Sequence, residues 1–191
     1  MLKIILEGSP LVSMINSAYS LARSGKDKRG IECYGLLFGK IENNNGSLIS
    51  RINFAQPIQI APRSYDAIWR CRKEECRTKR STKILTNNHL LGDYHSHIDG
   101  ETELSSTDKN DLRKTKNLYS LILSINKRKR LKNQNRIYVY PERKEIIFDI
   151  YEDYIIALGG YSYINGRIRR TELEIDKLNL SPLNKKIIKI S

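Results

Sequence analysis

The chain has 191 residues, of which 39% are apolar and 29% are charged, and this composition suits a single globular domain with a substantial core. Its 34 basic and 21 acidic residues give a formal net charge of +13, which attracts acidic partners. No apolar run approaches the roughly 18 residues of a membrane-spanning helix, and residues 2–6 are too short for a signal peptide, so we expect a cytoplasmic protein with no membrane partner.

The N-terminal quarter of the chain predicts a short strand followed by a helix. The strand is expected at residues 2–6. Ser9 is expected to cap the helix, with Pro10 at the first helical position and Gly25 beyond the last. Apolar residues recur at helical spacing and predict a stripe that faces the core: Leu11, Met14, Ile15, Ala18, Leu21 and Ala22.

The next part of the chain predicts a hairpin and a second helix. Residues 34–41 and 48–60 alternate like strands around a polar turn at 43–46, and Gln56-Pro57 predicts a bend inside the second strand. Residues 64–79 predict a helix with a basic outer face.

The remaining segments predict mostly strands. One helix is expected at 105–116, and strands are expected at 90–97, 118–125, 136–141, 145–151, 161–164 and 168–175. The apolar run 118–125 is typical of a central strand, whereas 136–141 and 145–151 alternate like edge strands. Asn165-Gly166 is a strong hairpin signal. The predicted fold class is therefore α/β, with a mixed and partly antiparallel sheet sandwiched by helices.

Two histidines lie two residues apart in the predicted strand at 90–97. Side chains alternate along a strand, so His95 and His97 share one face, with about 6.5–7 Å between their Cα atoms. Two imidazoles so placed suit one metal ion, and Asp108 can supply an oxygen ligand. Three protein ligands leave the fourth position of a zinc ion open for water, whereas a structural site closes it. The pattern predicts one catalytic Zn²⁺ per chain, at one edge of the sheet.

A hydrolytic zinc centre needs a general base, and Glu32 is the candidate. It opens the apolar segment 32–39, where a carboxylate is costly to bury unless it has a partner such as a zinc-bound water. The alternative interpretation is a solvated glutamate that precedes a strand.

These residues resemble the JAMM family of metalloproteases, also called MPN-plus or JAB. The likeness rests on a glutamate upstream of His-x-His-x7-Ser-x2-Asp, which spans 95–108 here. It also rests on 32–39, which looks like the family's Glu-x-x-Gly-x-Leu-x-Gly strand. The resemblance covers about residues 1–175 and implies the family's fold, with cytidine-deaminase-like layering. Many members carry Pro after the second histidine, whereas Ile98 stands here.

The resemblance implies an isopeptidase or peptidase that removes a modifier from protein conjugates. The modifier would be a ubiquitin-like or sulfur-carrier-like protein. Five residues receive roles: zinc ligation falls to His95, His97 and Asp108, general-base catalysis to Glu32, and oxyanion stabilisation to Ser105. Residues 1–175 would form the catalytic domain, and residues 176–191 a basic tail that is either docked or mobile.

Ser105 and Asp108 also have a purely structural interpretation. Ser-x-x-Asp is typical of a helix N-cap followed by an acidic residue in the first turn, where both stabilise unpaired N–H groups. The structural and catalytic roles are compatible.

Two other function classes stay open. A DNA-associated branch of the same fold carries this motif, and the basic block 126–132 is compatible with phosphate binding. The block lacks the interleaved aromatic residues of a base-stacking surface, so nucleic acid is possible but not favoured as a partner. Metal-free members of the fold act as scaffold subunits, but those typically lack the histidine pair.

The other histidine, acidic and cysteine residues carry weaker predictions. His89 is expected in a polar loop, and Asp93 either orients an imidazole or faces solvent. Cys33, Cys71 and Cys76 are odd in number and are expected to be reduced thiols. A second metal site at Cys71 and Cys76 would lack further ligands, and the role of this pair is left open.

Overall fold

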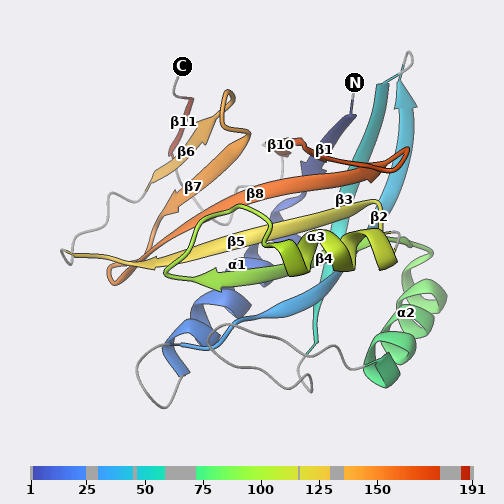
Figure 1. The fold of residues 1–191 in the computed structure, drawn as a ribbon, viewed down its shortest axis with the longest axis horizontal. Helices are drawn as coiled ribbons and strands as arrows, with labels where there is room; N and C mark the ends of the chain where they lie inside the picture. The colour runs from blue at the N-terminus through green and yellow to red at the C-terminus, as the bar shows by residue number, and fades with distance from the viewer. Residues whose placement is uncertain are drawn as a thin grey trace.

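The computed structural model describes residues 2–24, 30–44, 47–58, 72–115, 117–129, 136–176 and 186–189. Within them, helices surround a curled sheet (Figure 1). The helices are α1 (Gly8–Ser24), α2 (Arg72–Thr86) and α3 (Ser106–Thr115). The strands are β1 (Leu2–Leu6), β2 (Tyr34–Asn44), β3 (Ser47–Pro57), β4 (His89–Ile98), β5 (Tyr119–Lys127), β6 (Arg136–Tyr140), β7 (Glu145–Asp149), β8 (Tyr154–Ile164), β9 (Arg167–Arg170), β10 (Glu172–Ile175) and β11 (Lys186–Lys189).

The described strands form one mixed sheet. Their order is β10-β1-β3-β2-β4-β5-β8-β7-β6-β11, with β9 paired to β8 beside this path. β4 pairs antiparallel with β2 and parallel with β5. The predicted mixed, partly antiparallel sheet is confirmed. The expectation of a site at a sheet edge is wrong, because the histidine-bearing strand has a partner on each side.

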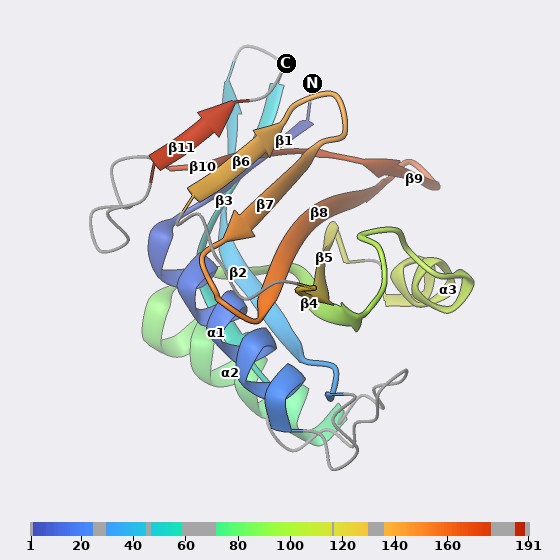
Figure 2. The same ribbon diagram turned by 90° about the vertical axis from the view of Figure 1, so that its left-hand side faces the viewer.

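The two faces of β5 pack against different helices. Leu121, Leu123 and Ile125 belong to the same buried cluster as the apolar stripe of α1. Ile122 points the other way and packs with Leu112 of α3. Burying each such side chain contributes about 1.5–3 kcal/mol, so this alternation fixes α3 over the sheet. Figure 2 shows α1 and α3 on different sides of β5.

The first helix begins, and the second helix ends, at a residue other than the one that the sequence predicts. α1 starts at Gly8, because the Leu11 N–H donates to the Glu7 carbonyl at 3.3 Å, so Ser9 lies inside the first turn and is not the cap. α2 continues to Thr86, seven residues beyond the predicted end, and its buried Glu75 accepts a hydrogen bond from the Tyr34 hydroxyl. Residues 64–71 and Gly25 lie outside the described residues. No helix in the described segments is long and apolar enough to cross a membrane.

The C-terminal strands differ more from the prediction. β8 starts at Tyr154, seven residues before the predicted strand, and it continues through Gly159-Gly160 because it pairs with β5 along this length. The predicted strand at 168–175 is two strands, since β9 pairs with β8 whereas β10 pairs with β1. β7 lies between β6 and β8 and is therefore not an edge strand. From the predicted tail, β11 is described and pairs in parallel with β6.

We predict that Gly92→Ala destabilises the protein far more than Gly166→Ala. A Cβ at Gly92 would lie 2.0 Å from the Tyr119 carbonyl oxygen, so β4 and β5 would have to separate, at about 3 kcal/mol or more of unfolding free energy. Gly166 has a φ of 76° in open space, so alanine there costs only the strain of the left-handed backbone, about 1–2 kcal/mol. Urea unfolding measures both values, and equal losses would contradict this account of the β4–β5 contact.

Candidate metal centre

His95 and His97 lie on one face of β4, near the end of the strand. The pairing of β4 with both neighbours holds the backbone between them. Both rings are half-buried, and their Nε2 atoms lie 3.2 Å apart. Two imidazole nitrogens at this distance converge on one point in space.

Asp108 approaches the same point from the first turn of α3. Its Oδ1 lies 3.2 Å from His95 Nε2, and its Oδ2 lies 3.4 Å from His97 Nε2. One ligand atom from each of the three residues can be chosen so that all lie within 4.8 Å of one another. Among the histidine, cysteine, aspartate and glutamate residues that the structure describes, these three form the one group that could hold a metal ion.

Ser105 fixes the orientation of the Asp108 carboxylate. The Ser105 N–H donates to Asp108 Oδ2 at 2.8 Å, and the Asp108 N–H donates to Ser105 Oγ at 3.1 Å. This reciprocal pair is a capping box, and the Lys109 N–H completes the turn by donating to the Ser105 carbonyl. The structural interpretation of Ser105 as a helix cap is thus correct. A hydroxyl that accepts one hydrogen bond keeps its own proton free to donate, so the cap leaves the catalytic role open.

The charges of the cluster stabilise one another. Burial alone would raise the pKa of Asp108, but hydrogen bonds from His95 and His97 hold that pKa well below its usual range. Burial alone would lower the pKa of His97, but its hydrogen bonds to Asp108 and to the Glu101 carbonyl raise it above the ordinary value. The carboxylate is therefore ionised, as a metal ligand must be.

The Glu101 carbonyl determines which nitrogen of His97 faces the cluster. His97 Nδ1 lies 3.0 Å from this oxygen, which can only accept a hydrogen bond. Metal binding requires the neutral ring; in that form an imidazole that donates through Nδ1–H carries its lone pair on Nε2, toward His95 and Asp108. Backbone carbonyls commonly orient metal-binding histidines in this way.

The three side chains fit a small tetrahedral ion. Zinc–ligand bonds of about 2.0–2.1 Å at tetrahedral angles place neighbouring ligand atoms about 3.4 Å apart. The two Nε2 atoms are 3.2 Å apart, His95 Nε2 is 3.2 Å from Oδ1 and His97 Nε2 is 3.4 Å from Oδ2, and each of these distances is close to this value. Two imidazoles with one carboxylate also form a donor set that suits zinc and other first-row transition metals. The group can therefore hold a metal ion.

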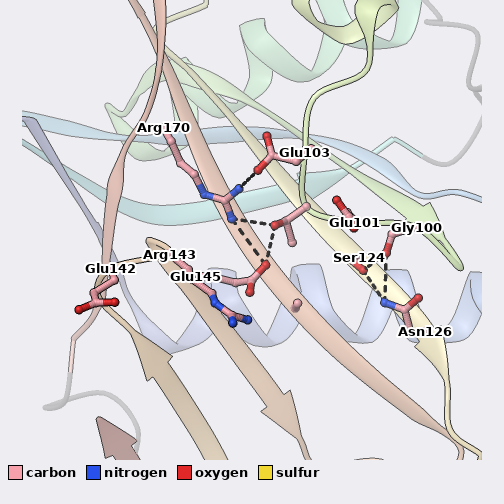
Figure 3. Close-up of a pocket in the computed structure, with 11 residues that line it drawn as sticks. Gly100, Glu101, Glu103, Ser124, Asn126, Glu142, Arg143, Glu145 and Arg170 are labelled. Carbon is pink, nitrogen blue, oxygen red and sulfur yellow. Dashed lines mark hydrogen bonds and ion pairs between the residues drawn. The ribbon is translucent and has the colours of Figure 1, made fainter. Parts of the chain in front are cut away.

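The loop between His97 and Asp108 is held by side chains from distant strands (Figure 3). Ser124 and Asn126 of β5 donate to the Gly100 carbonyl.

Farther along the loop, Thr102 donates to Glu145, and Arg170 binds both Thr102 and Glu103. The loop borders a polar pocket of about 550 Å³. These contacts hold in place the segment that joins the two ligand-bearing elements and presents the Glu101 carbonyl.

Glu32, the predicted general base, is buried, with 8% of its surface exposed. The Cys33 N–H donates to Ser96 Oγ, and the Ser96 N–H donates to the Cys33 carbonyl. These bonds extend the antiparallel register by which Tyr34 lies opposite His95. Glu32 then lies opposite His97 on the same face, and its negative charge contributes to the raised pKa of His97. The interpretation of Glu32 as a solvated residue is wrong.

The remaining candidates lie away from this group. Asp93 is buried and accepts hydrogen bonds from Asn117 and Ser120, so it does not face solvent. His89 is exposed at the first residue of β4, not in a loop. Cys33 is buried and Cys76 is exposed on α2, and both are free thiols, whereas Cys71 lies outside the described residues.

Sequence reasoning missed the residues that support the site. The contact of the Glu101 carbonyl cannot be predicted from the sequence, because every residue has a backbone carbonyl. Ser124, Asn126 and Arg170 lie far from the histidine motif in the sequence. Ser96 is the one of these supporting residues that the sequence could have revealed. It stands between the two histidines, faces away from them, and closes the contact to Cys33 next to Glu32.

Comparisons with known proteins agree with this fold. The solution structure of a protein from Desulfitobacterium hafniense matches with a TM-score of 0.56 at 14% sequence identity, over 91% of this chain and 92% of that chain. No curated protein matches the chain. The profile of prokaryotic homologues of the JAB domain matches residues 18–137, which is more than half of the chain and includes Glu32, the histidine pair and the Ser105–Asp108 turn. The chain therefore belongs to the prokaryotic JAB domain family.

Proposed function

We propose that this protein is a zinc-dependent hydrolase that cleaves the amide or isopeptide bond between a modifier and its target. The modifier would be a ubiquitin-like or sulfur-carrier-like protein. The observation that carries the proposal is the convergence of His95 Nε2, His97 Nε2 and the Asp108 carboxylate within 4.8 Å. Three ligands of this kind are typical of a catalytic zinc with one open position, and the described residues offer no thiolate to close it.

The roles of the protein residues follow from their positions. A bound zinc ion would act as a Lewis acid that polarises a carbonyl and acidifies water. Glu32, buried beside His97, would take a proton from the attacking water and deliver it to the leaving amine. The Ser105 hydroxyl would donate a hydrogen bond to the oxyanion that develops on the scissile carbonyl.

Family membership supports hydrolysis, and the geometry supports a metal, but the identity of the metal and of the conjugate are parts of the proposal. The fold class was predicted with cytidine-deaminase-like layering, and this layering also remains a prediction. The proposed bond is inferred from the resemblance to JAMM metalloproteases together with a buried carboxylate near a group of side chains that could hold a metal ion.

We predict that the purified protein binds about one zinc ion per chain and that His95→Ala or His97→Ala abolishes this binding. Removing one of three ligands leaves too few to retain the ion through dialysis. Metal analysis by mass spectrometry after dialysis measures the content. His89→Ala is the matched control, because His89 is exposed and outside the cluster, and it should keep the metal. Full zinc content in both cluster variants would show that the site is elsewhere.

Glu32→Gln should keep the fold and the metal but lower hydrolysis by roughly 10²–10⁴-fold, because it preserves the shape of the side chain and removes its basicity. Turnover is measured with a ubiquitin-like protein joined through its C-terminal carboxyl to a fluorogenic amine. Glu101→Gln is the control, since its exposed side chain changes in the same way while its carbonyl still binds His97. If the Glu32→Gln protein were active, another group would have to be the general base.

Two substitutions at Ser105 separate its catalytic role from its structural role. Ser105→Ala should lower turnover by roughly 10–10³-fold and unfolding free energy by about 1 kcal/mol, because the oxyanion donor and the cap are both lost. Ser105→Asp retains a good cap but places a negative charge beside the oxyanion, so stability should hold while turnover collapses. Thermal unfolding and turnover are measured on the same samples. Near-normal turnover of Ser105→Asp would restrict Ser105 to capping.

A further inference from the structure

A basic groove lies between α3 and the β8–β9 hairpin. Its volume is about 530 Å³, and five of its eight lining residues are basic while none is acidic. The basic residues come from two elements: Lys109 and Arg113 from α3, and Arg167, Arg169 and Arg170 from β9. Figure 2 shows α3 and β9 on the same side of the molecule. The groove therefore collects positive charge from segments about 55 residues apart in sequence.

Four of these charges have no carboxylate partner among the described residues. Arg170 pairs with Glu103 and Glu145, and it belongs to the network that holds the metal-site loop. Across the described residues, no carboxylate lies within salt-bridge distance of Lys109, Arg113, Arg167 or Arg169, and all four side chains are exposed. Like charges gathered on one surface repel one another, so an anionic partner in this groove would relieve the repulsion.

The groove begins beside the metal centre. Lys109 directly follows the ligand Asp108, and Arg113 lies one helical turn farther along α3. Four residues of helix separate these two cations by about 6 Å along the axis. In an extended polypeptide, every second side chain is about 6.6 Å from the next on the same face. A strand-like segment with carboxylates at alternate positions therefore matches the spacing of the cations on α3.

The composition of the groove favours a polypeptide over a nucleic acid. Single-stranded nucleic acids are held by exposed aromatic rings on which bases stack. Tyr161 is the aromatic residue that lines the groove, and it is only 4% exposed, with its hydroxyl donating to Glu103. Ile168 adds an apolar surface beside it, packed in the cluster with Leu112. The described lining thus offers cations and a small apolar floor but no ring for a base.

We propose that this groove binds an extended acidic segment of a protein partner and so holds that partner next to the metal centre. The proposal rests on the proposed function in taking this partner to be the conjugate that is cleaved. The binding itself depends on charge and shape and needs no hydrolysis. Arginine suits this task, because its planar guanidinium can bind a carboxylate through two hydrogen bonds.

The test measures binding of a short fluorescein-labelled peptide of alternating glutamate and serine to the full chain by fluorescence anisotropy. The groove variant carries Arg113→Glu, Arg167→Glu and Arg169→Glu, and it leaves Lys109 and Arg170 intact. The control variant carries Arg77→Glu, Arg80→Glu and Lys83→Glu on the exposed surface of α2. Each substitution removes two positive charges, so both variants fall from +13 to +7. Circular dichroism verifies that both are folded.

The groove variant should bind the peptide at least roughly tenfold more weakly than the unmodified chain, and the control variant should lose less than about threefold. Equal losses in the two variants would show that binding follows net charge, and this would overturn the proposal. Tighter binding of a labelled single-stranded oligothymidine, lost in the groove variant, would also overturn it and assign the groove to nucleic acid. Absence of peptide binding at low ionic strength would overturn the proposal as well. A chain that binds the peptide in the groove but hydrolyses no conjugate contradicts only the proposed function.

Discussion

The site depends on the hydrogen bonding of β4 to a partner on each side. β2 pairs along one edge of this strand and β5 along the other, so its backbone cannot rotate, and the alternation of side chains then places both imidazoles on one face. The same pairing brings Cys33 beside Ser96 and Glu32 opposite His97. The two candidate ligands and the buried carboxylate are thus positioned by the pairing of β4 and by two hydrogen bonds between Cys33 and Ser96.

The third candidate ligand, Asp108, is held by the cap of a helix and not by strand pairing. Asp108 lies in the first turn of α3, where the Ser105 N–H holds one carboxylate oxygen and leaves the other toward His95. α3 itself is fixed by Leu112, which packs on Ile122 of β5. The connecting loop is then tied to the sheet at Gly100, Thr102 and Glu103. The candidate metal centre, built from a strand and a helix, therefore depends on a core contact and on a polar network outside the three candidate ligands.

The sequence predicts the local features of this protein well and the long-range ones poorly. His95, His97 and Asp108 could be identified because strand alternation and a capping motif are short-range patterns, and the structure gathers these three side chains. The placement of β4 inside the sheet, the continuation of β8 through Gly159-Gly160 and the separate pairing of β9 and β10 depend on contacts between distant segments. The anchoring role of Arg170 is of the same kind, since its partners lie about 25 to 70 residues away.

The central claim is a three-ligand metal centre with one position left for a non-protein ligand. Crystallographic anomalous scattering at the zinc absorption edge, on protein loaded with zinc, tests it most directly. The account predicts one ion bonded to His95 Nε2, His97 Nε2 and one oxygen of Asp108, at about 2.0–2.2 Å, with a fourth ligand that is not from the protein. A zinc ion bound elsewhere, or closed off by a fourth protein side chain, would contradict it.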